Sequence, residues 1–373
     1  MALEFCCMPE FHDTLIVGAG PIGIELAVAL KRAGAPYLHV DAGAVGETMS
    51  WWAPGTKFFS SPERIGIAGV PLAVPGQEKA TREQYLDYLL AVVRQFGLAI
   101  ETHTRVESLR PLDEPDGDGA RFELTLRGLA GERAVRARSV VLAIGDMHRP
   151  RLLGVPGEDL PHVSHFLDDP RVYYGKRVLI VGGKNSAVEA AIRLYRAGVD
   201  VAISYRRDAF SKRVKYWLRP ELEYLIKRGS IGFHPNTVPT RIEPGRVTLA
   251  PTDEEGVPLE AAAGNGSARA ADAARVDADL VLLLTGYEQD TTLFEQAGVE
   301  LVGDNRAPRH DEGTMETNAP GLYVAGTAAA GTQVGGVTVF IETAHVHCDR
   351  IAAHLLGRRG ERHETPDYAL PES

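Results

Sequence analysis

The chain has few cysteines, no long apolar run and no excess of positive charge. Its three cysteines include no C-x-x-C pair, and three are too few for a disulfide framework. No apolar run reaches membrane-spanning length, and the acidic start lacks the apolar segment of a secretion signal, so we expect a cytoplasmic protein. With 40 basic and 50 acidic residues the formal net charge is -10, which argues against general nucleic-acid binding. We therefore expect neither a nucleic acid nor a membrane as partner.

The composition is that of a globular protein with about two domains. The 373 residues are too many for one ordinary hydrophobic core. Hydrophobic residues make up 44% and charged residues 24%, shares typical of folded soluble chains. We expect no metal site.

Residues 14–41 have the pattern of a dinucleotide-binding strand, turn, helix and second strand. Gly18, Gly20 and Gly23 match G-x-G-x-x-G. The first glycine allows a tight turn, the second lets a pyrophosphate approach the backbone, and the third lets helix and strand pack closely. The helix N-terminus supplies N–H groups for the phosphate. Asp41 follows the second strand, where its carboxylate can accept hydrogen bonds from a ribose. The alternative, a tight turn without a ligand, is less favoured because the flanking strands and the acid complete the pattern.

A long connection with four aromatic residues follows this unit. Glycine, proline and serine break any regular period in residues 42–72. Trp51, Trp52, Phe58 and Phe59 either anchor the loop on a core or form the wall of a site for a flat ring system. The sequence leaves both interpretations open.

A helix and a β-meander complete the first part of the chain. Thr81 is a suitable N-cap for a helix that runs to Phe96 and ends at Gly97. The strands predicted next lie around Val106 and at residues 121–126, 134–138 and 140–144. The last strand ends in residues 143–145, which either line the nucleotide or mark an ordinary glycine turn.

The second nucleotide pattern begins at residues 177–181, a predicted strand. Gly182 and Gly183 open a helix that runs to Arg196, but Lys184 replaces the central glycine of the fingerprint. A strand at residues 200–205 then delivers Arg206 and Arg207 where the first unit delivers Asp41. Arginine pairs with a 2′-phosphate, so this unit is expected to hold NADPH rather than NADH; the alternative is two solvated arginines.

A basic stretch at residues 209–229 stands out in an acidic protein. It contains Lys212, Arg213, Lys215, Arg219, Lys227 and Arg228 around Tyr216 and Trp217. It is either the solvated face of a helix or an anion-binding entrance for the cofactor phosphates or an acidic substrate. A second meander at residues 231–249, an alanine- and glycine-rich flexible hairpin at 252–274 and a strand at 278–284 follow.

The C-terminal part again places a glycine-rich loop ahead of a helix. A strand at residues 322–325 leads to Gly326 and Thr327, and a helix is predicted at residues 339–356. Such a loop suits a phosphate or the flavin end of FAD. Glu342 and His345, one helical turn apart, either lie near the flavin or form an ordinary surface pair.

The order of these parts resembles the two-dinucleotide-domain flavoproteins. Within that group, GGKNSA at residues 182–187, FFSS at 58–61, VKYWLRP at 214–220 and VFIET at 339–343 resemble bacillithiol disulfide reductases. These are FAD- and NADPH-dependent, related to thioredoxin reductase, and lack its active-site C-x-x-C; Lys184 is ordinary among them. The resemblance implies an α/β fold with two Rossmann-like (three-layer ββα) domains, each with a β-meander. It implies a discontinuous FAD-binding domain at residues 1–150 and 285–373 and an NADPH-binding domain at 151–284.

The resemblance also assigns the site residues. Those expected to bind FAD are Gly18, Gly20, Pro21, Ile22, Gly23, Asp41, Ala42, Gly46, Thr48, Trp51, Phe59, Ser60, Val106, Ala143, Ile144, Gly145, Gly326, Thr327 and Glu342. Those expected to bind NADPH are Gly182, Gly183, Lys184, Asn185, Ser186, Arg206, Arg207, Lys212, Thr285, Gly286 and Tyr287.

Two positions depart from the related proteins. Ile22 stands where bacillithiol disulfide reductases typically carry a cysteine, and Thr327 stands where the broader superfamily has an acid that bonds the ribitol chain. Cys6 and Cys7 precede the first strand, and Cys348 lies alone on the last helix. We therefore expect electrons to pass from the flavin directly to the substrate sulfur.

The expected function is a flavin-dependent reductase that passes electrons from NADPH to a low-molecular-weight disulfide. No side chain is assigned as catalytic, because the flavin is the reactive group. A flavin monooxygenase-like enzyme is an alternative, suggested by Ile22 and the GEDLPHVSHF run at residues 157–166. A reductase of an electron-carrier protein and a non-enzymatic NADPH or redox sensor are further alternatives. The expected partners are a small-molecule disulfide or other electron acceptor and further copies of the chain in a homo-oligomer.

Overall fold

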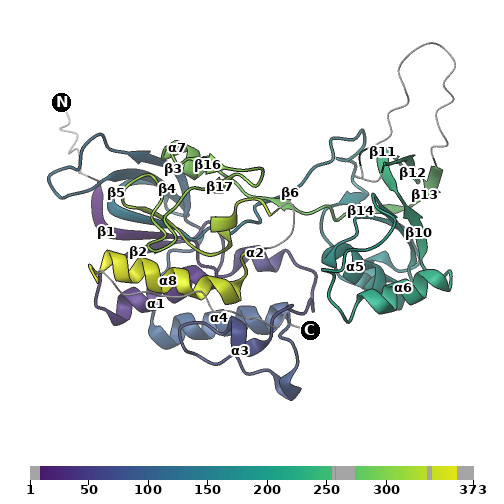
Figure 1. Ribbon diagram of the computed structural model, residues 1–373, viewed down its shortest axis with the longest axis horizontal. Helices are drawn as coiled ribbons and strands as arrows, with labels where there is room; N and C mark the ends of the chain where they lie inside the picture. Colours follow the sequence, from purple (N-terminus) through teal and green to yellow (C-terminus); the bar gives the residue numbers. More distant parts are fainter. Residues whose placement is uncertain (1–8, 254–256, 258–273, 334–337, 359–373) are drawn as a thin grey trace, which may run out of the picture. The chain divides into compact units, whose positions relative to one another are not determined.

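The computed structural model describes residues 9–253, 257, 274–333 and 338–358. They divide into two compact units (Figure 1). Unit 1 holds residues 9–51, 55–149 and those from Tyr287 onward, and unit 2 holds Trp52–Pro54 and Pro150–Gly286. Trp52–Pro54 falls inside the predicted first domain but belongs to unit 2.

Unit 1 is built on a mixed sheet with the strand order β2-β1-β5-β4-β3, and β18 also pairs with β5. Its parallel part consists of β1 (Glu10–Val17), β2 (Leu38–Val40), β5 (Gly131–Leu142) and β18 (Leu322–Val324). Its antiparallel part consists of β3 (Arg105–Pro111), β4 (Phe122–Gly128) and the first half of β5. The predicted strands at 134–138 and 140–144 are one strand, because Ser139 continues the ladder by pairing with Thr14.

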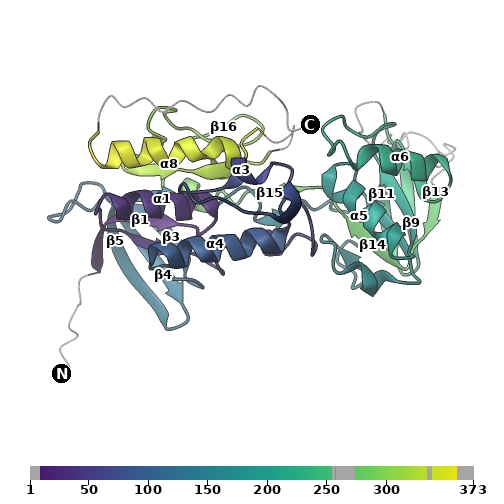
Figure 2. The same ribbon diagram turned by 90° about the horizontal axis from the view of Figure 1, so that it is seen from below.

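The helices of unit 1 supply the apolar layer against this sheet. The main ones are α1 (Pro21–Arg32), α4 (Arg82–Phe96) and α8 (Ile341–Leu355). Helices α1 and α8 lie side by side in both views (Figures 1 and 2). The predicted cap of α4 is confirmed: Thr81 Oγ1 accepts the Gln84 N–H, the Gln84 side chain accepts the Thr81 N–H, and Gly97 ends the helix in the left-handed region.

Shorter elements complete unit 1. They are α2 (Glu47–Ser50), α3 (Pro62–Ile65), α7 (Thr292–Gln296), the 3-10 helices η1 (Pro75–Gln77) and η3 (Gly326–Ala330), and the paired strands β16 (Leu301–Val302) and β17 (Ala307–Pro308). Strands β6 (Arg149–Pro150) and β15 (Tyr287–Glu288) pair where the chain leaves and re-enters the unit.

Unit 2 has a fully parallel sheet with the order β10-β9-β8-β14-β7. Its strands are β7 (Val163–Ser164), β8 (Arg177–Val181), β9 (Asp200–Tyr205), β10 (Gly232–Pro235) and β14 (Leu280–Leu283). A separate antiparallel sheet contains β11 (Thr237–Glu243), β12 (Arg246–Pro251) and β13 (Ala274–Asp277). The helices are α5 (Asn185–Arg196), α6 (Arg219–Lys227) and the 3-10 helix η2 (Pro170–Tyr173).

One part of the second meander was predicted wrongly. Residues 232–235 form β10, which pairs in parallel with β9, because α6 acts as the crossover of a β-α-β unit. The meander itself begins at β11. Most of the predicted hairpin at residues 252–274 lies outside the described residues.

The predicted fold class is confirmed, since each unit combines parallel strands, helices and a three-stranded antiparallel segment. None of the described helices is both long enough and apolar enough to span a bilayer.

Candidate functional site

The predicted FAD residues gather at one edge of the unit 1 sheet. Gly18 follows β1, Asp41 follows β2, residues 143–145 follow β5, and Gly326 and Thr327 lie just after β18. These four strands are parallel, so their carboxyl ends lie at the same edge. In open α/β sheets this is the edge where ligands bind.

The fingerprint glycines of unit 1 have the geometry of a diphosphate cradle. Gly18 has φ +109°, and a Cβ there would lie 2.4 Å from the Ala143 carbonyl oxygen. A Cβ on Gly23 would lie 1.9 Å from the Gly18 carbonyl oxygen, whereas one on Gly20 would meet no atom within 4 Å. Helix α1 starts at Pro21 with Gly20 as its N-cap and no side-chain cap. Open space in front of uncapped N–H groups fits a pyrophosphate.

Asp41 is fixed by the turns around it. Its Oδ2 accepts the Ala19 N–H at 2.5 Å, and its Oδ1 accepts the Gly43 N–H at 2.7 Å. Burial raises the pKa of the Asp41 carboxyl, although these two N–H groups act in the opposite direction. Each carboxylate oxygen keeps a second lone pair for a ribose hydroxyl. Gly46 joins the same turn, because its N–H donates to the Ala19 carbonyl at 3.0 Å.

His39 forms a hydrogen bond with the first glycine of the fingerprint. Its Nε2 lies 2.9 Å from the Gly18 carbonyl oxygen, so this nitrogen carries the hydrogen. Burial lowers the pKa of His39 to about 4, and the ring is therefore neutral at physiological pH.

The other two loops approach the fingerprint. A Cβ built on Gly145 would lie 3.8 Å from Thr327 Oγ1, and one built on Gly326 would lie 3.4 Å from the Ile22 Cβ. The structure thus brings together three predicted segments that are far apart in the sequence.

Gln289 joins two of these loops, and sequence reasoning missed it. Its Nε2 donates to the Gly145 carbonyl at 3.1 Å and to the Ala328 carbonyl at 2.9 Å. The residue is 3% exposed, and its Oε1 is buried without a hydrogen-bond partner among the described residues. No local pattern marks Gln289, because its partners lie in distant segments.

The aromatic connection has a mixed role. Phe58 is buried, and its ring centroid lies 4.5 Å from that of Tyr85, so it anchors the loop on the core. Trp51 and Phe59 are half-buried, and Ser60 is buried. The assignment of Trp51, Phe59 and Ser60 to FAD stays a prediction, as do those of Ala42, Thr48 and the buried Val106.

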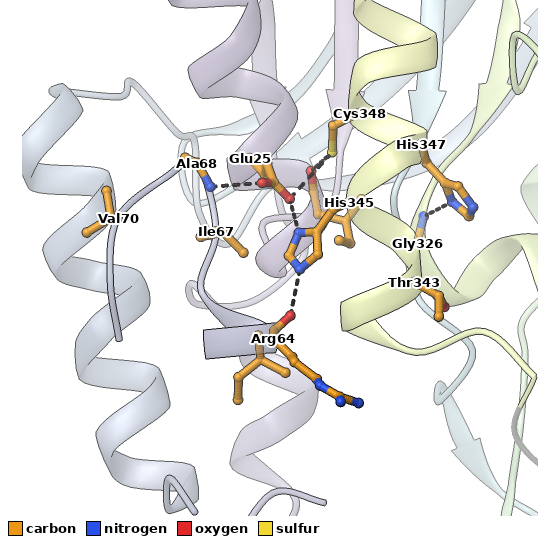
Figure 3. A network of polar contacts seen from close by, with 12 residues as sticks. Glu25, Arg64, Ile67, Ala68, Val70, Gly326, Thr343, His345, His347 and Cys348 are labelled. Atoms are coloured by element: carbon orange, nitrogen blue, oxygen red, sulfur yellow. Dashed lines mark hydrogen bonds and ion pairs between the residues drawn. The ribbon is translucent and has the colours of Figure 1, made fainter. Parts of the chain in front are cut away.

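Glu342 and His345 do not form a surface pair. Glu342 is 7% exposed, and its Oε2 is buried without a hydrogen-bond partner among the described residues. His345 instead contacts Glu25 of α1, with 2.6 Å between Nδ1 and Oε2 (Figure 3). A buried acceptor without a donor fits a hydroxyl or N–H group of the predicted cofactor.

Cys348 lies beside Ile22, the position at which the resemblance led us to expect a cysteine. Its Sγ lies 3.3 Å from the Ile22 carbonyl oxygen. The thiol is buried, and burial raises the pKa of Cys348 well above its usual value. A buried thiol that stays protonated is a poor nucleophile, which disfavours a thiol relay through this residue.

The second fingerprint repeats the cradle in unit 2. A Cβ on Gly182 would lie 2.4 Å from the Leu284 carbonyl oxygen, and one on Gly183 would lie 2.5 Å from the Tyr205 ring. Helix α5 starts at Asn185, with Lys184 as N-cap and no side-chain cap. Arg206 and Arg207 are exposed at the end of β9, on the neighbouring strand.

Four positive charges gather at the start of α5. Burial lowers the pKa of Lys184, and the charges of Arg206, Arg151 and Arg213 lower it further. Arg151 is held in place because its carbonyl accepts from Thr285 Oγ1 at 2.9 Å and its N–H donates to the Gly286 carbonyl at 3.0 Å. Such a cluster favours a phosphate. Arg151 was missed, and Arg213 was noticed as part of the basic stretch but not assigned.

The basic stretch divides into different roles. Lys215 is 6% exposed, and its Nζ lies 2.8 Å from Glu189 Oε2, so it is not part of an entrance. The Lys215 N–H also donates to Asn185 Oδ1 at 2.7 Å, which ties the loop carrying Lys212 and Arg213 to α5.

Tyr287, which is predicted to bind NADPH, belongs to unit 1.

Comparison with known proteins shows the family of this chain. The family described as pyridine nucleotide-disulphide oxidoreductase matches residues 15–326. "Bacilliredoxin reductase Bdr" of Bacillus subtilis is 29% identical over 93% of this chain and 98% of that protein. The "Bacillithiol Disulfide Reductase Bdr (YpdA)" structures from Staphylococcus aureus and Bacillus cereus are 28% and 29% identical, with TM-scores of 0.81 and 0.83; each comparison covers 94% of this chain, and 99% and 100% of the other. The chain therefore belongs to the pyridine nucleotide-disulphide oxidoreductase family and is an FAD- and NADPH-dependent oxidoreductase.

Proposed function

We propose that this enzyme uses NADPH to reduce a low-molecular-weight disulfide such as oxidised bacillithiol, without an enzyme C-x-x-C. The net reaction oxidises NADPH to NADP⁺, takes up one proton and converts one S–S bond into two thiols. FAD, when bound, supplies the two-electron chemistry that links these two half reactions. The similarity to two bacillithiol disulfide reductases supports this substrate class.

The assignment of FAD to unit 1 and of NADPH to unit 2 depends on the opposite charges at the ends of β2 and β9. Asp41 in unit 1 offers acceptors to the ribose hydroxyls of FAD, and Arg206 in unit 2 offers a cation to the 2′-phosphate of NADPH. The residues of the FAD site would orient the flavin, and the orphaned Glu342 Oε2 would accept a hydrogen bond from it. Lys184, Arg151 and Arg213 would add charge for the NADPH phosphates.

We also propose a cytoplasmic location and a homo-oligomeric assembly for this enzyme. Cytoplasmic location is favoured because a reductase of small disulfides acts where thiols are kept reduced. Homo-oligomerisation stays a prediction, which light scattering of the purified protein will test.

Steady-state kinetics test the proposal. We expect purified yellow protein to oxidise NADPH rapidly only when oxidised bacillithiol is added, with glutathione disulfide and oxygen as comparison acceptors. NADPH consumption that is indifferent to every disulfide would remove the proposed substrate class. Oxygen-dependent consumption with product hydroxylation would support the monooxygenase alternative instead.

A further inference from the structure

The His345 ring lies between two hydrogen-bond acceptors. Its Nδ1 is 2.6 Å from Glu25 Oε2 of α1, and its Nε2 is 2.9 Å from the Arg64 carbonyl oxygen at α3 (Figure 3). A carbonyl oxygen cannot donate, and a carboxylate cannot donate unless it is protonated. Both contacts are satisfied when His345 is an imidazolium that donates from its two nitrogens to an ionised Glu25 and to the Arg64 carbonyl. This form carries one proton more than a neutral histidine beside a carboxylate.

Glu25 extends this contact to the segment after α3. Its Oε1 accepts the Ala68 N–H at 2.8 Å, and the Ala68 carbonyl accepts from Arg32 Nη2 at 3.1 Å. Ala68 has φ +54°, a conformation that a non-glycine residue keeps only when its surroundings fix it. Helix α1 therefore binds both the N–H and the carbonyl group of Ala68.

Helix α4 holds the same segment through two tyrosines. Tyr85 OH donates to the Ile65 carbonyl at 2.8 Å, and Tyr88 OH accepts the Ile67 N–H at 2.7 Å. The segment also lines an open cleft of about 540 Å³ that includes Pro62, Glu63, Gly66, Gly69 and Val70. Its position is fixed by these polar contacts with α1, α4 and α8 together with the buried side chains of Ile65 and Ile67.

The charged and titratable groups around His345 favour its protonated form. Burial alone would lower the pKa of His345, but Glu25, the Arg64 carbonyl and Asp349 raise it above 6.5 in total. Burial raises the pKa values of Tyr85, Tyr88 and Cys348, so these groups stay neutral where a histidine titrates. The Arg64 guanidinium points away from the ring (Figure 3). His345 is therefore the group at this contact that keeps its proton above the ordinary pKa of a histidine.

The segment held in this way continues the proposed FAD site. Residues 58–61, which include Phe59 and Ser60, lead directly into α3. We propose that His345 is a positioning residue whose proton joins α1, α3 and α8 and so keeps residues 58–61 in the conformation that binds FAD. Loss of that proton leaves an acceptor facing an acceptor and loosens the segment. This inference rests on the proposed placement of FAD in unit 1.

The first test observes the proton directly in the wild-type holoenzyme. ¹⁵N-labelled histidine gives imidazole signals that report the protonation of each ring nitrogen, and assignment uses the His345→Gln variant. We expect both His345 nitrogens to carry hydrogen at about pH 8, where an ordinary histidine is neutral. A neutral ring at that pH would overturn the inference, and the protonation itself is measured on the wild-type protein.

The second test measures FAD affinity against pH by flavin fluorescence. We expect the wild-type affinity to fall about tenfold from neutral to strongly alkaline pH, the effect of losing one charged hydrogen bond. His345→Gln should show the weaker affinity at every pH and no alkaline step. Glu25→Gln should keep the neutral-pH affinity at every pH, because the glutamine amide can donate to a neutral His345 Nδ1 and still accept the Ala68 N–H. The matched control, His354→Gln on the same helix, should behave like wild type.

The outcomes separate this inference from the proposed function. An equal loss of affinity at all pH values, with the alkaline step kept in His345→Gln, would mean that His345 fills space and does not act through its proton. If FAD binding and disulfide reduction by the wild-type enzyme do not change with pH, this inference is overturned and the proposed function is not. A protein that binds no FAD at any pH would overturn the proposed function itself.

Discussion

His345 and His347 lie two residues apart on α8 and are held in opposite protonation states. His345 faces two acceptors, Glu25 and the Arg64 carbonyl, and therefore needs hydrogen on both nitrogens. His347 Nδ1 accepts the Gly326 N–H at 3.2 Å, so this nitrogen must be free of hydrogen (Figure 3). Burial lowers the pKa of His347 to about 4, in agreement with a neutral ring.

His347 should make the protein less stable in acid. Its folded pKa is depressed below the ordinary 6.5, so its contribution is complete above 6.5 and is lost as pH falls from 6.5 to 4. A difference of that size corresponds to about 3 kcal/mol of unfolding free energy. His347→Gln keeps an acceptor for Gly326 but does not titrate, so urea unfolding across this pH range should show a shallower acid loss. His39, with its pKa also lowered to about 4, remains in both proteins. An identical acid loss in wild type and variant would contradict this account.

Two fingerprint glycines should respond differently to alanine. A methyl at Gly20 meets no protein atom within 4 Å, so Gly20→Ala should fold and yet bind FAD at least about tenfold more weakly, because the methyl occupies the pyrophosphate space. A methyl at Gly23 would lie 1.9 Å from the Gly18 carbonyl, so Gly23→Ala should destabilise unit 1 itself by roughly 1–3 kcal/mol. Thermal unfolding of apoprotein and FAD titration separate the two effects. Normal FAD binding by Gly20→Ala would refute the placement of the pyrophosphate.

Arg206 should select the phosphorylated nucleotide. A charge-assisted hydrogen bond contributes roughly 1.5–3 kcal/mol, so Arg206→Ala should weaken NADPH by about ten- to a hundredfold and leave NADH nearly unchanged. Arg213→Ala should also weaken NADPH binding, because the charge of Arg213 is near enough to Lys184 to lower its pKa. Arg241→Ala removes an exposed arginine on β11 of the same unit and serves as control. Equal losses for NADPH and NADH would exclude a 2′-phosphate contact at Arg206.

A chain without cysteine should still reduce disulfides. Cys348 is buried with a raised pKa, and Cys6 and Cys7 lie outside the described residues. We expect the triple variant Cys6→Ser, Cys7→Ser, Cys348→Ala to keep its NADPH:disulfide turnover, with about 1–2 kcal/mol lost in stability at position 348. Turnover abolished in protein that still binds FAD would show that an enzyme thiol takes part.

Gln289 should contribute to FAD binding through the loops that it joins. Gln289→Glu replaces a donor by an acceptor and leaves the Gly145 and Ala328 carbonyls without their donor. Each unsatisfied buried group costs roughly 1–3 kcal/mol, and FAD affinity should fall by about tenfold. Flavin titration measures the change, with Gln95→Glu on the exposed side of α4 as control. Unchanged affinity would mean that the two loops hold their positions without Gln289.

Local sequence was sufficient where a backbone geometry depends on one residue type. The positions of Gly18, Gly23 and Gly182 could be interpreted from sequence because a Cβ there would collide with backbone, and Thr81 because its side chain caps the adjacent helix. Predictions failed where a strand's partner is remote. Strand β5 changes from an antiparallel to a parallel partner along its length, and β10 joins a sheet through a crossover helix.

By itself, the sequence determined the two nucleotide cradles, their opposite terminal charges and the absence of a C-x-x-C pair, because each is a short-range pattern of residue types. Tertiary structure alone decided that Lys215 is buried against Glu189, that Arg151 joins the cations at α5, and that Glu25 meets His345 across 320 positions of the chain. The physical reason is that a side chain's charge and hydrogen bonds depend on its neighbours in space. Those neighbours are set by how distant strands and helices pack.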